Sequence, residues 1–168
     1  MSRKPTKKPV AKKAPAKRST KASGGDERHY PSRPVVGVGV VIWREDKVLL
    51  VKRGREPRKG EWGLPGGMQQ LGETIFHAAV REAREETGLD ITPLGIVTAI
   101  DGIAKDKKGE VEFHYTIIEV AAESRAGKAK AQDDAEDVRW ATLEEIEQLC
   151  AWPEVARIAR LSMLQRTL

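Results

Sequence analysis

The sequence predicts an α/β domain in which helices pack on a mixed β-sheet. Its length leaves room for about one domain. Its β-branched runs come mostly in hairpin-like pairs, and helical segments follow them along the chain. Paired strands followed by helices are typical of a sheet covered by helices.

The first predicted strands are two β-branched runs that are close in sequence. Val35–Trp43 is the first strand and Lys47–Lys52 the second, and the polar pair between them suits a hairpin turn. The stretch Gly54–Gly67 is rich in glycine, proline and charge, and is predicted to be a long loop. A loop of this length inside a compact domain is usually functional.

A helix and a second pair of strands follow this loop. The helix is expected over Glu73–Thr87, with Gly88 placed to cap its C-terminus. The strands are expected over Ile91–Ile100 and Val111–Val120, and the polar stretch Asp101–Glu110 is predicted to be the turn between them.

The C-terminal part is predicted to contain one short strand and two helices. The strand is expected over Asp137–Ala141. Thr142–Glu145 has the spacing of a capping box and opens a helix that runs through Leu149. Pro153 suits the first turn of a final helix that ends near Leu164.

The basic charge of the chain is concentrated at its start. The first 34 residues hold 11 of the 30 Lys and Arg but only 2 of the 25 Asp and Glu, so the rest is mildly acidic. Residues 1–29 are rich in Lys, Ala and Pro, and bury too little apolar surface to offset their ordering entropy. We therefore expect a disordered basic tail over 1–29 and a folded domain over 30–168.

The basic tail predicts weak, nonspecific binding of nucleic acid through counterion release. Residues 1–28 contain no aromatic side chain on which a base could stack, so no sequence preference is expected. A solubilising or targeting role is the alternative. The single cysteine, Cys150, allows no intrachain disulfide, and no apolar run approaches the ~20 residues that span a bilayer. We expect a soluble cytoplasmic protein without membrane contact, and the state of assembly, a homodimer included, stays open.

Three glutamates are crowded into one turn of the predicted helix. Glu82 lies three residues before Glu85 and four before Glu86, so the three carboxylates share one side. Like charges at this spacing cost roughly 0.2–0.5 kcal/mol per pair. A bound Mg²⁺ explains the arrangement, because this ion prefers oxygen ligands and takes one or two carboxylates. The alternative is a solvated acidic face with Arg81 and Arg84 as ion-pair partners.

The glutamates keep a fixed spacing to glycines on both sides. The full pattern is G-x5-E-x7-R-E-U-x-E-E-x-G-U, where U is an apolar residue. It resembles the signature of the Nudix hydrolase family, and Ala83 stands where a bulkier aliphatic residue is usual. The resemblance covers roughly residues 35–150. The fixed positions that match are Gly67, Glu73, Arg81, Glu82, Glu85, Glu86 and Gly88.

The resemblance implies an α/β/α sandwich with a mixed sheet and a hydrolase that needs Mg²⁺, with Mn²⁺ as a substitute. It makes Glu82 and Glu86 direct metal ligands and Glu85 a ligand or the catalytic base. It assigns Glu73 to the metal shell and Arg81 to the orientation of a catalytic glutamate. Gly66 is expected to present a backbone carbonyl to the metal. The implied reaction is attack of water on a nucleoside diphosphate linked to another group.

The loop before the helix bears on the substrate. From Gly60 onward it is similar to a Nudix subgroup of ADP-ribose pyrophosphatases, which indicates ADP-ribose or a similar nucleotide sugar. The cationic residues suit phosphates, although an exposed charged loop is an equally good interpretation. Trp62 is a candidate for base stacking, although a core anchor is the simpler interpretation. The expected substrate-binding residues are Arg53, Arg55, Arg58, Trp62 and Gly67.

Members of this family often add one carboxylate from a loop near the end of the sheet. Glu136 is the first choice for an added catalytic residue because it lies just before the last predicted strand. The other acids of this loop, each also explained as a solvated turn residue, are Asp133, Asp134 and Asp137.

Other functions remain open beside the nucleotide-sugar hydrolase. One is a pyrophosphatase that removes (d)NTPs from the nucleotide pool. Another is a hydrolase of mRNA caps or 5′-triphosphates, which only the basic tail supports. From a different class, the domain could sense a nucleotide or bind RNA without catalysis, although a complete set of glutamates argues against that.

Overall fold

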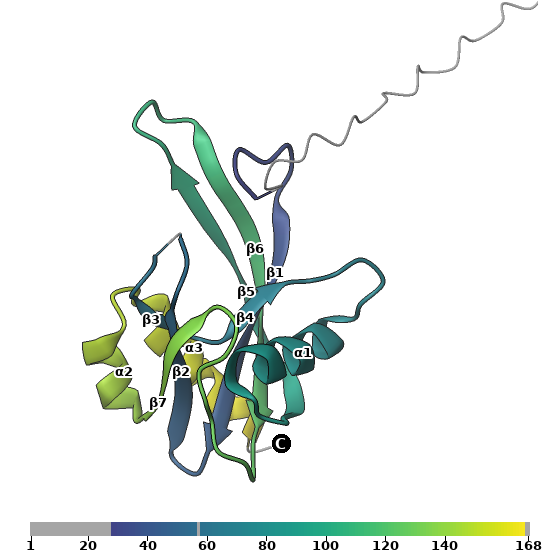
Figure 1. The fold of residues 1–168 in the computed structure, drawn as a ribbon, viewed down its shortest axis with the longest axis vertical. Helices are drawn as coiled ribbons and strands as arrows, with labels where there is room; N and C mark the ends of the chain where they lie inside the picture. The colour runs from purple at the N-terminus through teal and green to yellow at the C-terminus, as the bar shows by residue number, and fades with distance from the viewer. Residues whose placement is uncertain (1–27, 57, 167–168) are drawn as a thin grey trace, which may run out of the picture.

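The computed structural model describes residues 28–56 and 58–166 (Figure 1). The predicted tail lies almost wholly outside the described residues. The first described residues already contact the sheet, because the Tyr30 N–H donates to the Glu112 carbonyl at 2.8 Å. Among the described residues, no helix is long and apolar enough to cross a membrane.

The described chain forms a mixed sheet with helices on both of its faces, as predicted. The strand order is β3-β2-β1-β6-β5, with β4 added on β1 and β7 on β2. The β1–β6 pair is parallel and the other pairs are antiparallel. The strands are β1 (Val35–Arg44), β2 (Lys47–Arg53), β3 (Trp62–Gly63), β4 (Gly66–Met68), β5 (Thr92–Lys105), β6 (Val111–Glu123) and β7 (Ala135–Ala141). The helices are α1 (Ile75–Thr87), α2 (Leu143–Leu149) and α3 (Glu154–Ser162), followed by the 3-10 turn η1 (Met163–Arg166).

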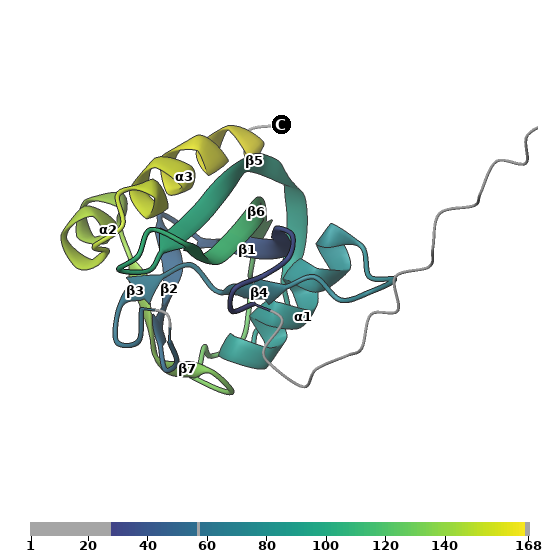
Figure 2. The same ribbon diagram turned by 90° about the horizontal axis from the view of Figure 1, so that it is seen from above.

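Two apolar cores fill the spaces between the sheet and the helices. Alternate residues of β1 point to opposite faces, as the period of a strand requires. Val40 and Ile42 pack with Ala79 of α1, whereas Val41 and Trp43 pack with α2 and α3. Figure 2 shows α1 and α3 on opposite sides of the sheet. The result is the expected α/β/α sandwich.

Helix α1 has a defined cap at each end. The Thr74 hydroxyl accepts a hydrogen bond from the His77 N–H at 3.2 Å, so the helix begins two residues later than predicted. Glu73 therefore lies just outside the helix. Gly88 ends the helix in the left-handed conformation at a φ of 69°, as the sequence indicates.

The loop predicted over Gly54–Gly67 contains the short strands β3 and β4, so the prediction of an uninterrupted loop is wrong. β4 pairs with β1 through Val38 opposite Gly67. Glycine has little intrinsic preference for strands. The pairing comes from a partner strand distant in sequence, which the local composition does not reveal.

The turn predicted over Asp101–Glu110 is also wrong in extent. β5 continues through Lys105, and only residues 106–110 form the connection to β6. The Asp106 carboxylate accepts the Glu110 N–H at 2.9 Å and closes this turn. The long hairpin extends past α2 and α3 (Figure 1), so the outer part of its surface lies beyond these helices.

Boundaries in the C-terminal part agree with the predictions or differ from them by a few residues. β7 begins at Ala135, which places Glu136 inside a strand. The capping box at Thr142 is present as predicted. α3 ends at Ser162 and η1 continues the turn to Arg166, with Pro153 as the residue before the helix.

Candidate active site

Helix α1 carries three glutamates that differ in their exposure. Glu82 is buried, with 9% of its surface accessible. Glu86 is mostly buried, whereas 46% of the Glu85 side chain is exposed. The spacing that suggested one shared side therefore places two carboxylates in the interior and one at the surface.

Arg81 joins the acidic residues into one network. Its Nε and Nη2 donate to the two carboxylate oxygens of Glu73 at 2.8 and 2.9 Å. Its Nη1 donates to Glu82 at 2.6 Å and to Glu85 at 3.0 Å. Nη2 also donates to the Met68 carbonyl at 3.0 Å, which fixes the arginine to β4. A forked guanidinium is suited to such planar, two-pronged contacts.

The two glycines of β4 allow the helix to approach the sheet closely. A Cβ on Gly67 would lie 2.3 Å from Glu82 Oε1, so only glycine leaves room for this carboxylate. The Gly66 N–H donates to Glu86 Oε2 at 2.9 Å. Gly67, which opens the sequence pattern, and its neighbour Gly66 thus leave room for two glutamates of that pattern.

Burial perturbs the two interior carboxylates. Desolvation raises the pKa of Glu82, and the hydrogen bonds from Arg81 only partly oppose this. Desolvation raises the pKa of Glu86 to about 7, against the lowering effect of the Gly66 N–H. A buried carboxylate becomes stable in its charged form when a cation lies beside it. Oxygen donors of this kind match Mg²⁺ in chemistry.

The carboxylates are turned toward Arg81 and Gly66 and do not converge on one point. Within residues 28–56 and 58–166, no three acidic, histidine or cysteine side chains are close enough together to hold a metal ion. The carboxylate oxygens are therefore the type of ligand that Mg²⁺ prefers. One oxygen of Glu82 already accepts a hydrogen bond from Arg81.

A loop from β6 to β7 covers the C-terminal end of α1 and brings one further acid near the glutamates. The Gln132 N–H donates to the Glu86 carbonyl at 3.0 Å. Asp134 follows in the same loop, and its charge contributes to the raised pKa of Glu86. Glu136, the first choice from the sequence, lies on β7 with its carboxylate 4.0 Å from the Lys52 ammonium. The charge of Asp134 thus acts on Glu86, and Glu136 stays a candidate for the added catalytic residue.

The predicted substrate-binding residues divide into two groups. Arg53 is near enough to lower the pKa of Glu86, and Arg55 forms an ion pair with Asp134 at 2.8 Å. Arg58 lies over the Trp152 ring, 4.6 Å from its centroid, and Trp62 packs against the core under α2 and α3. The first pair thus borders the glutamates, whereas the second pair lies toward the other face of the sheet.

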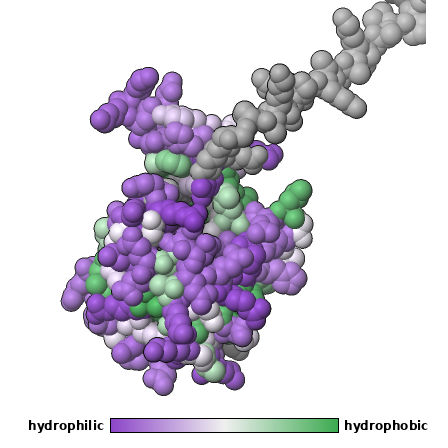
Figure 3. Space-filling view, viewed as in Figure 1, coloured by the Kyte–Doolittle hydropathy of each residue, from purple (hydrophilic) through white to green (hydrophobic). Residues whose placement is uncertain are grey.

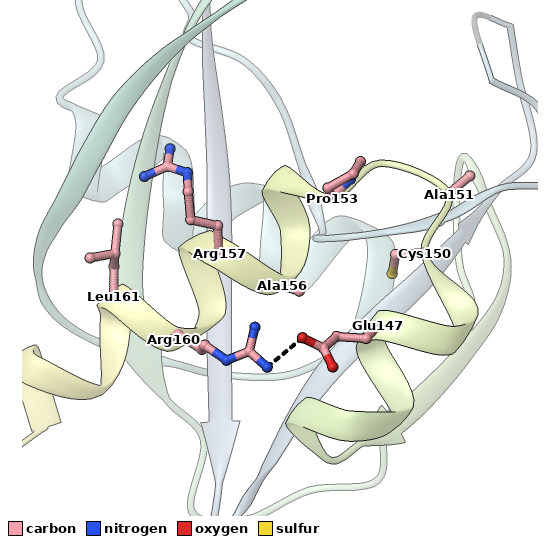
Figure 4. A pocket seen from close by; sticks show the side chains of 8 residues that line it. All are labelled: Glu147, Cys150, Ala151, Pro153, Ala156, Arg157, Arg160 and Leu161. Carbon is pink, nitrogen blue, oxygen red and sulfur yellow. Dashed lines mark hydrogen bonds and ion pairs between the residues drawn. The ribbon is translucent and has the colours of Figure 1, made fainter.

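Other features of the surface lie apart from these residues. The face seen in Figure 3 is predominantly hydrophilic. A groove between α2 and α3 is bordered by Cys150, Pro153 and Arg157 (Figure 4). The groove contains none of the predicted site residues.

The sequence did not single out Glu119, an acid that is buried in the structure. Glu119 of β6 has 3% of its surface accessible and lies opposite Gly39 of β1. The available signal was a single charged residue inside the apolar run that continues through Ala122.

Comparison with known proteins agrees with this geometry. A family model described as the NUDIX domain matches residues 33–161. An ADP-ribose pyrophosphatase of Methanocaldococcus jannaschii is 35% identical over 116 residues, which are 69% of this chain. The match covers 66% of that relative, so the chain spans slightly less than two thirds of its length.

Solved structures show the same fold. A NUDIX hydrolase from Nitrosomonas europaea matches with a TM-score of 0.65 and 23% identity, over 79% of this chain and 90% of that one. The NUDIX domain of Shewanella oneidensis NrtR, complexed with ADP ribose, matches with a TM-score of 0.62 and 22% identity, over 82% and 90%. Since the family model covers well over half of the sequence, the chain belongs to the NUDIX domain family.

Proposed function

We propose that this chain is a Mg²⁺-dependent hydrolase that cleaves the diphosphate of ADP-ribose or a similar nucleotide sugar. The observation that carries the proposal is the glutamate cluster of α1, packed against Gly66 and Gly67 and joined by Arg81. Two desolvated carboxylates on one helical turn are costly unless they serve a cation. The products would be AMP and ribose 5-phosphate.

Glu82 and Glu86 would hold the metal, together with the Gly66 carbonyl, and Mn²⁺ would serve as a substitute. Glu73 would support this shell by holding Arg81 from the side opposite to Glu82. When bound, the ion neutralises diphosphate oxygens and lowers the pKa of a bound water. The glycine cradle holds both side chains close to β4.

Glu85 is the proposed base. Its side chain is half exposed and can reach a water, and Arg81 Nη1 holds one of its oxygens at 3.0 Å. Arg81 is therefore a positioning residue for Glu85. Asp134 shares the electrostatic environment of Glu86 and joins Glu136 as a candidate for the added catalytic carboxylate.

Substrate contacts are proposed for the segment that precedes the glutamate helix, on both faces of the sheet. Arg53 and Arg55 border the cluster and suit the diphosphate, and the backbone at Gly67 allows close approach. Arg58 and Trp62 lie farther along the loop and suit the rest of the nucleotide. The names of the relatives, ADP-ribose pyrophosphatase and an ADP ribose complex, support this substrate class.

The test is a substrate panel with product analysis. The full chain is incubated with Mg²⁺ and ADP-ribose, nucleotide sugars, dinucleoside polyphosphates or dNTPs. We expect AMP plus ribose 5-phosphate from ADP-ribose, no product with excess EDTA, and recovery when Mg²⁺ is restored. Cleavage of dNTPs alone would favour the pool-cleaning pyrophosphatase. Binding without turnover across the panel would favour a sensor.

We propose a separate role for the basic segment over residues 1–29, which precedes the domain over 30–168. Its charge supports weak binding to nucleic acid at low salt. Deleting residues 2–28 should abolish retention on immobilised RNA at low salt while hydrolysis is unchanged. Equal retention of the truncated chain would contradict this role. A homodimer and a cytoplasmic location stay predictions.

A further inference from the structure

Strand β5 leaves one edge of the sheet open. It lies at the end of the strand order and, among the described residues, pairs only with β6. From Thr98 to Ala104 its register with β6 is regular, without a bulge. This stretch belongs to the hairpin that extends past α2 and α3 (Figure 1). A regular edge of this length presents unpaired N–H and C=O groups that can pair with another strand.

The two halves of β5 differ in how this edge is protected. In the first half the register with β6 shifts twice, and the Gln165 amide donates to the Ile96 carbonyl at 3.3 Å. Irregular or covered edges resist pairing with a further strand. In the outer half Asp101 is the only charge before Lys105, and Ile103 exposes 55% of its surface. An exposed aliphatic side chain on an uncovered edge favours pairing with another strand.

A second copy of the same strand is the partner that the charges of β5 fit. A two-fold axis between two antiparallel copies of one strand places a residue opposite its own copy. With the axis at Asp101, two like charges would face each other, which destabilises the pair. With the axis at Ile103, two aliphatic side chains meet, and Asp101 lies opposite Lys105 of the second copy. This is the register in which both charges of the outer half are paired.

Asp101 and Lys105 are available for this pairing. Asp101, Ile103 and Lys105 are alternate residues of β5, so their side chains lie on one face of the strand. The Asp101 carboxylate accepts the Thr116 hydroxyl at 3.2 Å, and neither Asp101 nor Lys105 forms an ion pair with another described residue. Opposite charges directly across two antiparallel strands stabilise their pairing. The two-fold symmetry forms this contact twice.

The register also fits the length of the free edge. With the axis at Ile103, the turn of residues 106–110 in one copy lies opposite residues 96–100 of the other. The paired stretch therefore ends where Gln165 covers β5 at Ile96. Because the two strands run in opposite directions, the two domains lie at opposite ends of the paired hairpins.

We propose that the chain forms a homodimer in which β5 pairs antiparallel with β5 of a second copy, about a two-fold axis at Ile103. The contact joins two strand edges and is small, so the dimer forms reversibly. The glutamate cluster of α1 takes no part in the contact. The inference is therefore independent of the proposed function.

A cysteine at the axis tests the contact directly in the full chain. Ile103→Cys places two thiols opposite each other, at a Cα distance of about 5 Å that suits a disulfide. With oxidised glutathione as the oxidant, we expect a covalent dimer that a reducing agent separates. The matched control is Ala99→Cys, an exposed position on the same face of β5 that lies opposite the turn of the second copy and should stay monomeric on a denaturing gel. The native Cys150 is buried and the same in both variants.

Charge reversal tests the register. In sedimentation velocity, the dimer fraction of the wild type should rise with concentration. Lys105→Asp places carboxylates opposite each other twice, and should weaken dimerisation by at least about tenfold. Asp101→Lys combined with Lys105→Asp restores opposite charges and should restore the dimer. Lys128→Asp, in the exposed loop between β6 and β7, should leave dimerisation unchanged.

Three results would overturn the proposal. One is a wild type that stays monomeric at every concentration. Another is a dimer that Lys105→Asp leaves unchanged, or that the double reversal does not restore. The third is equal cross-linking of Ile103→Cys and Ala99→Cys, or none of either. Cleavage of ADP-ribose should be the same in all these variants, so a failure of the proposed function is measured separately.

Discussion

Replacing Glu86 or Glu85 by glutamine is expected to lower turnover of the preferred substrate by at least about 100-fold. In Glu86→Gln the loss comes from a metal ligand that no longer carries charge. In Glu85→Gln the loss comes from a base that can no longer accept a proton. The fold should persist, because an amide oxygen at position 86 can still accept the Gly66 N–H. Steady-state kinetics with Mg²⁺ measures the effect.

The matched control is Glu147→Gln. Glu147 is an exposed glutamate of α2 that pairs with Arg160 on the surface, far from α1 in the sandwich. Its turnover should equal that of the wild type. Circular dichroism should be the same for the three variants and the wild type, and without Mg²⁺ Glu86→Gln should unfold at the wild-type temperature or above, because the amide removes a desolvated charge. Near-wild-type activity in both Glu85→Gln and Glu86→Gln would contradict the proposed mechanism.

Local patterns in the sequence were sufficient for the elements that are defined locally. Helix α1 was predictable because its glutamates recur at helical spacing and Gly88 supplies the left-handed cap. The capping box at Thr142 was predictable for the same reason. The β1–β2 hairpin follows from two β-branched runs with a turn of two polar residues.

Elements that depend on distant partners were not predictable in this way. β4 exists because Gly66–Met68 meets β1, and its own composition favours a loop. The long β5–β6 hairpin continues through charged positions such as Asp101, because each strand pairs with the other over its full length. Local polarity predicted a turn there, and cross-strand pairing prevails over it.

The candidate site shows the same division. The spacing of Glu82 and Glu86 indicated a common side of one helix, and the structure has both at β4. The electrostatic effect of Asp134 on Glu86 depends on a loop that folds back over the end of α1, which the order of residues in the sequence does not reveal. Glu119 could not be singled out from the sequence. Only the structure shows that its Oε2 is buried and has no hydrogen-bond partner among the described residues.

Replacing Arg81 by glutamine is expected to reduce both stability and activity. The Arg81 side chain is 21% exposed, and it neutralises Glu73 and Glu82, whose side chains are 13% and 11% exposed. Removing one partner of such a pair leaves a desolvated charge. We expect a loss of about 2 kcal/mol in the free energy of unfolding, less than for a fully buried pair because solvent still screens these groups. Turnover should fall as well, because Glu85 loses the donor that positions it.

The matched control is Arg84→Gln on the same helix. Arg84 pairs with Asp90 at the surface, and the two side chains are 67% and 78% exposed. Its stability should stay within about 0.5 kcal/mol of the wild type, with normal turnover. An equal effect of both substitutions would mean that Arg81 contributes only helix propensity and surface charge.

The pH dependence of unfolding tests the assignment of Arg81 more directly. The hydrogen bonds from Arg81 lower the pKa of Glu73 from 4.5 to about 2 in the folded chain. A lowered carboxyl pKa contributes stability above the unfolded value, and this contribution is lost as the pH falls toward 2. In denaturant unfolding with EDTA, the difference between wild type and Arg81→Gln should therefore be largest at neutral pH and shrink between pH 4.5 and 2. A difference that is constant over this range would show that Arg81 stabilises the fold by packing alone, and would remove the basis for its role in positioning Glu85.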